Sequence, residues 1–227
     1  MKSYKVSREI LRKDLIIILL ILLMFIIGFV SYPFLPEKIP MHWNFKGEID
    51  RYGSKFEGVW AIPLLTLFLY LGLLFIPYID PERENYIKFE KVYQIIKLSL
   101  VIVLSILYYI TIIVGLGGPK DLIPKIVPIT IGILFIILGN YMPRIKHNWF
   151  VGIRTPWTLS NEEVWRKTHR FGGYLFVISG ILMIITGFLP PYWNFVFLIL
   201  SVFLSGVLSI FYSFILYKRI ENKKGEF

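Results

Sequence analysis

Six long uncharged runs constrain the fold of this 227-residue chain more than any other feature. No Asp, Glu, Lys, Arg or His interrupts them, and a helix needs about 20 apolar residues to cross a bilayer. The runs are 15–35, 59–79, 98–119, 126–142, 171–190 and 191–217, of which the fourth is the shortest. Hydrophobic residues make up 56% of the chain, too many for a soluble domain of this size. We therefore predict an all-α fold, a polytopic membrane helical bundle of six transmembrane helices in the cell membrane.

Positive charge predicts how the bundle is oriented. Nineteen of the 25 Lys and Arg residues fall in segments on the side of the N-terminus, and six fall on the opposite side. Because short loops rich in Lys and Arg stay inside, we expect the N- and C-termini to be cytoplasmic. These cations crowd the ends of apolar runs, so the net charge of +10 indicates anionic lipid headgroups as a partner and no direct nucleic-acid binding.

The longest polar interval, 148–173, reads NWFVGIRTPWTLSNEEVWRKTHRFGG and lies on the predicted cytoplasmic side. We call it the signature segment. Ser160 and Glu163 have the spacing of a capping box, which predicts a helix that begins near Asn161. That helix would lie at the membrane interface with an aromatic side and a cationic side. The candidate binding residues are Gly152, Arg154, Thr155, Pro156, Trp157, Ser160, Trp165, His169 and Arg170.

Arg154 has two interpretations. It follows Gly152 and precedes Thr155-Pro156 near a bilayer edge, where a guanidinium can bind phosphate or carboxylate through two hydrogen bonds. It can equally extend to the lipid headgroups while its aliphatic stem stays in apolar surroundings.

The second polar interval, 36–58, is predicted to be extracytoplasmic. Pro36 and Pro40 favour extended backbone, and Gly47 and Gly53 permit positive φ at turns, so we expect a shaped loop without helix. The candidate binding residues here are His42, Trp43, Asn44, Gly47, Asp50 and Lys55.

Other patterns concern helix boundaries and packing. Asp80-Pro81 resembles an N-cap, and we expect the helix that follows to run past Lys97 into the third span. Serines at 201, 205, 209 and 213 and glycines at 173, 180 and 187 predict a tight antiparallel hairpin of the last two spans, broken only at Pro190-Pro191.

The sequence offers little support for catalysis. Ion-coupled carriers usually hold an ionisable group at membrane depth, and the six runs have none. A metal site made of His42, Asp50 and Glu57, or of His169 and Glu162, is conceivable, but neither shows a familiar ligand spacing. We predict no catalytic residues, no metal and no cofactor, and we expect the helices to be a scaffold with recognition confined to the polar loops.

The signature segment resembles that of the SdpI family of bacterial and archaeal membrane proteins, which are named for immunity against a secreted killing factor. The loop sequence IPMHWNFKGEIDRYGSK resembles an uncharacterised domain found N-terminal to it in longer members. Two units follow from the resemblance: 1–97, with spans one and two, and 98–227, with the SdpI-like segment. The resemblance implies a secreted peptide toxin as the outer partner and a cytoplasmic transcriptional repressor as the inner one.

Three functions follow as hypotheses. The leading one is a non-enzymatic immunity and signalling protein that gives resistance to a secreted membrane-active peptide. The alternative is a membrane enzyme or exporter that acts on a lipid or cell-envelope precursor, with Arg154 and His169 holding a phosphate. The third is a purely structural membrane partner.

Overall fold

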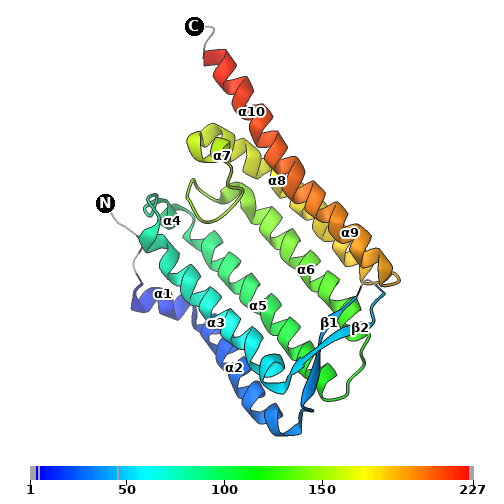
Figure 1. Cartoon of the computed structure of the whole chain (residues 1–227). Coiled ribbons are helices and arrows are strands. Elements are labelled where there is room, and N and C mark those ends of the chain that lie inside the picture. Colours follow the sequence, from blue (N-terminus) through cyan, green and yellow to red (C-terminus); the bar gives the residue numbers. More distant parts are fainter. Residues whose placement is uncertain (1–3, 5, 45, 225–227) are drawn as a thin grey trace.

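A computed structural model describes residues 4, 6–44 and 46–224. Its helices include six that are long and apolar enough to cross a membrane, which confirms the predicted all-α bundle (Figure 1). The helices are α1 (Arg8–Lys13), α2 (Leu15–Ser31), α3 (Lys55–Ile79), α4 (Asn85–Lys88), α5 (Glu90–Gly115), α6 (Leu122–Tyr141), α7 (Pro156–Ser160), α8 (Glu162–Thr186), α9 (Tyr192–Val202) and α10 (Leu208–Lys224). Two short 3-10 helices (Tyr32–Phe34 and Met142–Arg144) and a π-helix (Phe203–Val207) complete the helical elements of the described residues.

The chain ends lie at one end of the bundle, together with the signature segment (Figure 1). We call this the signature end. Which side of the membrane it faces stays a prediction, and Lys2 and Lys5, which contribute to that prediction, lie outside the described residues. Helix α5 contacts α2 and α3 on one side and α6 on the other. The predicted division of the chain at 97/98 falls inside α5 and also stays a prediction.

A two-stranded sheet forms where only a shaped loop was predicted. Strands β1 (Lys38–Trp43) and β2 (Ile49–Ser54) pair antiparallel, and α3 begins directly afterwards at Lys55. Gly47 has the expected positive φ, of 79°, but Gly53 does not, because it pairs with Ile39 within the sheet. The β-hairpin crosses the end of the bundle opposite the termini, which we call the hairpin end (Figure 1).

The glycines of α8 pack against a different helix from the one predicted. A Cβ on Gly173 or Gly180 would collide with backbone oxygens of Gly139 or Gly132 in α6, so these glycines allow α6 and α8 to approach closely. The predicted hairpin of the last two spans does form, after the break at Pro190-Pro191. The serines hold it: Ser179 and Ser201 exchange hydroxyl-to-carbonyl hydrogen bonds of 3.2 and 3.3 Å between α8 and α9.

A buried ion pair corrects the expectation that the spans are free of charge. Lys97 lies two turns inside α5, and its Nζ donates to both carboxylate oxygens of Asp14 at 2.8 and 2.6 Å. Both side chains are fully buried, and Tyr70 also donates to Asp14 at 3.3 Å. The pair was missed because Asp14 and Lys97 each stand next to an apolar run and resemble loop charges. Their attraction joins α2 to α5 near the signature end.

The segment between α3 and α5 is interrupted instead of forming one helix. Asp80 is the C-cap of α3, although its carboxylate does accept a hydrogen bond from Glu82 N as an N-cap would. Helix α4 has four residues and ends at Lys88, and the φ of its C-cap Phe89, −128°, is not helical. This break places Asp80 and Tyr86 beside the signature segment, 62 to 69 residues later in the sequence.

Candidate functional site

The signature segment is fixed to its own helix by Gly152 and His169. Nε2 of His169 accepts from Ile153 N at 3.0 Å, and Nδ1 lies 2.8 Å from Trp165 O. Because an N–H can only donate and a carbonyl can only accept, His169 must be neutral with its proton on Nδ1. Gly152 has φ 117°, and a Cβ there would overlap Nε2 of His169. The motif therefore needs glycine at 152 and histidine at 169 to hold the chain in this path.

Thr155 and Thr158 form the capping box of this region. Thr155 Oγ1 accepts from Thr158 N at 3.1 Å, and Thr158 Oγ1 accepts from Thr155 N at 2.8 Å. Pro156 stands at the first turn of α7, where its missing N–H costs nothing. Thr155 Oγ1 also lies 3.1 Å from Ser213 Oγ, which joins α7 to α10.

A helix does begin near Asn161 as predicted, at Glu162, but its cap at Ser160 and its interfacial position are both wrong. Asn161 caps α8, accepting from the backbone N of Glu163 and Val164, whereas the hydroxyl of Ser160 donates back to Trp157 O. Trp165 is buried, with Nε1 donating to Ile145 O at 3.0 Å. Its ring stacks on His169 at 4.0 Å, so the aromatic side of the helix faces protein instead of the membrane surface.

A missed cluster joins this segment to α4. Asp80 accepts from Trp149 N at 3.0 Å and from the hydroxyl of Tyr86 at 2.7 Å. Burial, and then the bond to Asp80, raises the pKa of Tyr86, so the phenol stays a neutral donor. Fully buried Asn148 accepts from Phe150 N at 2.9 Å. Asn148 opens the signature segment, so a search for turn-forming asparagines could have found it, but the contact with Asp80 has no local signal.

What remains on the surface of the signature end is mostly cationic. Arg154, Arg166 and Arg170 are exposed, and one N–H of Arg154 donates to Trp149 O at 3.1 Å. Trp157 is half-buried against Phe214. A cavity of about 520 Å³ lies beside this surface and has charges of both signs. Its lining includes Lys88, Lys146, His147, Glu162, Glu163 and Arg166.

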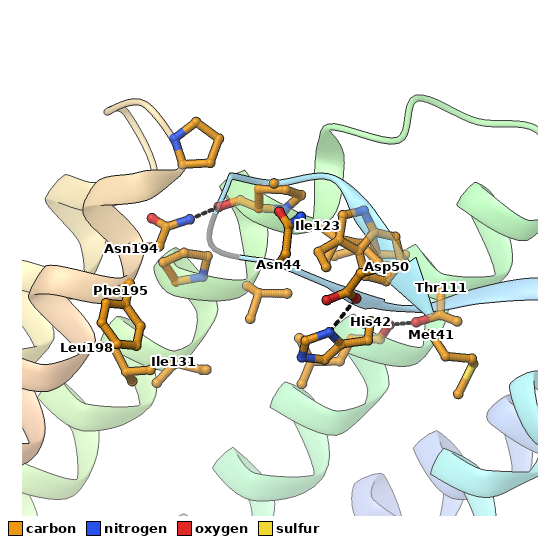
Figure 2. Close-up of a pocket in the computed structure, with 18 of the residues that line it drawn as sticks. Met41, His42, Asn44, Asp50, Thr111, Ile123, Ile131, Asn194, Phe195 and Leu198 are labelled. Atoms are coloured by element: carbon orange, nitrogen blue, oxygen red, sulfur yellow. Dashed lines mark hydrogen bonds and ion pairs between the residues drawn. The ribbon is translucent and has the colours of Figure 1, made fainter. Parts of the chain in front are cut away.

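A larger cavity lies at the hairpin end, and we call it the hairpin pocket. It measures about 1010 Å³ and is bounded by the β-hairpin and by α5, α6, α8 and α9 (Figure 2). Leu107 of its lining lies about two turns inside the end of α5 at Gly115. The expectation that the helices are only a scaffold is therefore wrong in one respect, since their apolar side chains form pocket walls at membrane depth. The helix residues of the lining are Leu107, Ile110, Thr111, Ile123, Pro124, Val127, Pro128, Ile131, Met183, Asn194, Phe195 and Leu198.

The hairpin brings five of the six residues predicted there to this pocket. They are His42, Trp43, Asn44, Gly47 and Asp50. The sixth, Lys55, lies away from it, with Nζ 3.9 Å from Glu37 and 4.8 Å from the centre of the Tyr32 ring. An added Cβ on Gly47 would lie 2.9 Å from Pro191 Cγ, so the hairpin tip rests on the turn between α8 and α9.

Neither of the two metal sites considered from the sequence is assembled. His42 Nδ1 lies 2.6 Å from Asp50 Oδ1 (Figure 2), but Glu57 pairs with Arg51 at 3.1 Å. Both ring nitrogens of His169 are engaged by backbone atoms. Across the described residues, no group of three or more His, Asp and Glu side chains could hold a metal ion.

Asn194 is the pocket residue that the sequence gave least reason to choose. Pro124 O would normally accept from the N–H four residues later, but residue 128 is proline and has none. Asn194 Nδ2 donates to this carbonyl instead, at 2.8 Å (Figure 2). The proline pair in α6 was a usable signal for a missing donor, but only the fold shows which side chain supplies it.

Comparison with known proteins matches two stretches of the chain. Residues 144–213 match the SdpI/YfhL protein family, and residues 19–67 match a domain of unknown function, DUF1648. Over 214 residues the chain is 28% identical to the immunity protein SdpI of Bacillus subtilis (strain 168), covering 94% of this chain and 100% of that protein. No solved structure matches. The first stretch contains the signature segment and the second contains the β-hairpin, so both predicted resemblances are confirmed, and the chain is a multi-pass membrane protein.

Proposed function

We propose that this chain, which carries the SdpI-family and DUF1648 segments together, is a membrane immunity protein that gives resistance to a secreted membrane-active peptide. The main support is the hairpin pocket, to which five residues of the predicted outer motif contribute. The full-length similarity to a protein named for immunity supports the same conclusion. With the termini in the cytoplasm, as the distribution of Lys and Arg favours, the hairpin faces the side from which a secreted peptide arrives.

Binding, and not catalysis, explains this site best. The lining is apolar with a few polar groups at the hairpin, which is typical of a ligand pocket. At the other end, His169 uses both ring nitrogens to hold backbone, which argues against the alternative in which Arg154 and His169 hold a phosphate.

Resistance assays with hairpin variants test the proposal. Cells that lack the gene are challenged with culture filtrates of their own and neighbouring strains, and we expect increased sensitivity to at least one filtrate. Trp43→Ala should fail to restore resistance because it removes a pocket wall. Tyr52→Ala should restore it, since Tyr52 is an aromatic residue of the same hairpin that is 51% exposed and outside the pocket. Unchanged sensitivity in the deletion strain, or equal rescue by both variants, contradicts the proposal.

The second part of the proposal is recruitment of a cytoplasmic repressor. The exposed cations of the signature end, Arg154, Arg166 and Arg170, favour an acidic protein surface or anionic lipid. The double variant Arg166→Glu/Arg170→Glu should keep resistance but lose the transcriptional response to the peptide. RNA sequencing after peptide challenge measures that response, and an unchanged response in the variant refutes recruitment through this surface.

A further inference from the structure

The hairpin pocket has a carboxylate in its wall and no lysine or arginine. Among the described residues that line it, Asp50 is the only acidic one, although the chain has 25 Lys and Arg residues that could have served as partners. His42, next to Asp50, is the only other lining side chain that can carry a charge. With His42 neutral, the lining is therefore negatively charged in a chain whose net charge is +10.

Asp50 is held in place and is still accessible. Nδ1 of His42 donates to Oδ1 of Asp50 at 2.6 Å, because a carboxylate can only accept. Asp50 exposes 41% of its side chain, and a carboxylate has more acceptor sites than one hydrogen bond uses. Figure 2 shows the pair on the hairpin wall, across the pocket from Phe195 and Leu198 of α9. A positively charged group that arrives from water can therefore pair with Asp50.

The opposite wall of the pocket is reachable from lipid. Phe195 and Leu198 are 56% and 42% exposed, and they belong to a helix that is long and apolar enough to cross a membrane. The walls between are mostly aliphatic, which suits an apolar ligand body. A ligand that fits both sides of the pocket is an amphiphile, with an apolar body and a cationic group.

The charge of the lining also separates peptide from lipid. Every phospholipid has a phosphate between its acyl chains and any amine, and the described lining offers no Lys or Arg to pair with a phosphate. Membrane-active amphipathic peptides combine an apolar face with Lys and Arg on the polar face. Such a peptide places a cation beside its apolar side chains without an anion between them.

We propose that the hairpin pocket selects cationic amphipathic peptides, and that Asp50 determines this selection. The apolar side chains of the peptide occupy the walls of α5, α6 and α9, and a lysine or arginine next to them pairs with Asp50. The inference rests on the proposed function for a membrane-active peptide as the ligand. It adds the charge that the peptide must carry and the residue that recognises this charge.

The test varies the charge of the peptide and of the pocket together. The full chain is reconstituted in phosphatidylcholine nanodiscs and titrated with a dansylated, C-terminally amidated peptide, a short run of leucine and alanine that ends in two lysines. A matched peptide ends in two glutamines. Empty nanodiscs give the partition of each peptide into lipid, which is subtracted.

The lysine peptide should bind the wild-type chain about 3- to 5-fold more tightly than the glutamine peptide, as expected for one partly exposed ion pair. In Asp50→Asn, which keeps an acceptor for His42, the two peptides should bind equally. Asp50→Glu keeps the charge and should keep the preference for lysine. Asp121→Asn is the control and should also keep it, since Asp121 lies outside the pocket and pairs with Lys125 at 2.6 Å.

Equal binding of the two peptides to the wild-type chain overturns the proposal, as does a preference for lysine that survives in Asp50→Asn. Loss of the preference in Asp121→Asn as well would assign it to the general charge of this end, and no binding above the empty-nanodisc level would leave the pocket without a peptide. Both results contradict the proposal. Size-exclusion profiles show whether each variant is folded.

A second arm tests lipid as the occupant. The titration is repeated in nanodiscs that also contain phosphatidylethanolamine, whose headgroup carries an ammonium beside its phosphate. Unchanged affinity for the lysine peptide supports the proposal, and loss of binding there identifies the lipid headgroup as the occupant and overturns it. If the gene confers resistance in cells while the two peptides bind alike, charge selection fails and the immunity function stands. If lysine is preferred through Asp50 but the deletion strain is not sensitised, the reverse holds.

Discussion

The two ends of the bundle each carry a conspicuous polar motif, but they use it differently. At the signature end, Gly152, Thr155 and His169 hold the backbone of the segment itself. At the hairpin end, five residues of the predicted motif line a cavity of about 1010 Å³. The comparison teaches that a motif can be specific in sequence because the fold requires it, while the residues that remain available for a ligand lie elsewhere.

The largest expected effect is at the buried ion pair near the signature end. Lys97→Met leaves Asp14 charged and without its lysine in the interior, which should destabilise the chain by about 3–5 kcal/mol. Asp14→Asn/Lys97→Met should recover much of this loss, because no charge remains buried. Unfolding in a denaturing detergent, followed by circular dichroism, measures both variants.

Lys13→Met is the control for the ion pair. Lys13 also contacts carboxylates, Glu9 and Glu90, but its side chain is 43% exposed. Its removal should change stability far less. If Lys97→Met is no less stable than Lys13→Met, the signature end does not depend on its buried pair.

Gly152→Ala sharpens the comparison with a smaller effect. The positive φ at residue 152 and the collision of the new Cβ with His169 should together lower the free energy of unfolding by about 2–3 kcal/mol. The causes are left-handed backbone strain and a lost hydrogen bond. Gly72→Ala is matched to it, since a Cβ at Gly72 meets nothing within 4 Å and alanine favours helix by about 1 kcal/mol. Thermal unfolding of the two variants should shift in opposite directions. Equal shifts would show that Gly152 has no special structural role.

Lys55→Gln should have the smallest effect. The pair with Glu37 is 3.9 Å long and Glu37 is 92% exposed, so its loss should change stability by less than about 1 kcal/mol. Because Lys55 lies outside the pocket, Lys55→Gln should restore resistance to the deletion strain as well as the wild-type chain does. The peptide challenge of that strain checks this, and a large loss of resistance would move the binding site away from the pocket.

Span number and the two motifs were readable from the sequence because they depend on local properties. Length and hydropathy decide whether a helix can cross a bilayer, and both are properties of a continuous stretch. The helix predicted near Asn161 had an aromatic side, on which Trp165 and His169 are four residues apart, and their stacking confirms that they are neighbours. The burial of these two side chains was not predicted, because it depends on which segments pack against α8.

Two of the missed features share one physical cause, which is contact between distant segments of the chain. Asp14 and Lys97 are 83 residues apart, and each stands beside an apolar run as a loop residue would. Only the packing of α2 on α5 brings the two together. Asn194 and Pro124 are 70 residues apart, and their bond depends on the packing of α9 near α6. The cap at Ser160 was a different error, since Asn161 stands next to it and asparagine is as good an N-cap as serine.

The most direct measurement compares resistance per folded molecule for one variant from each end. Trp43→Ala and Gly152→Ala are expressed in the deletion strain, folded protein is quantified by fluorescence-detected size-exclusion chromatography, and survival under peptide challenge is divided by that amount. We expect Trp43→Ala to lose resistance per folded molecule because it removes a pocket wall, whereas Gly152→Ala should be less abundant but keep resistance per folded molecule. Full resistance in Trp43→Ala together with loss in abundant Gly152→Ala would contradict the account.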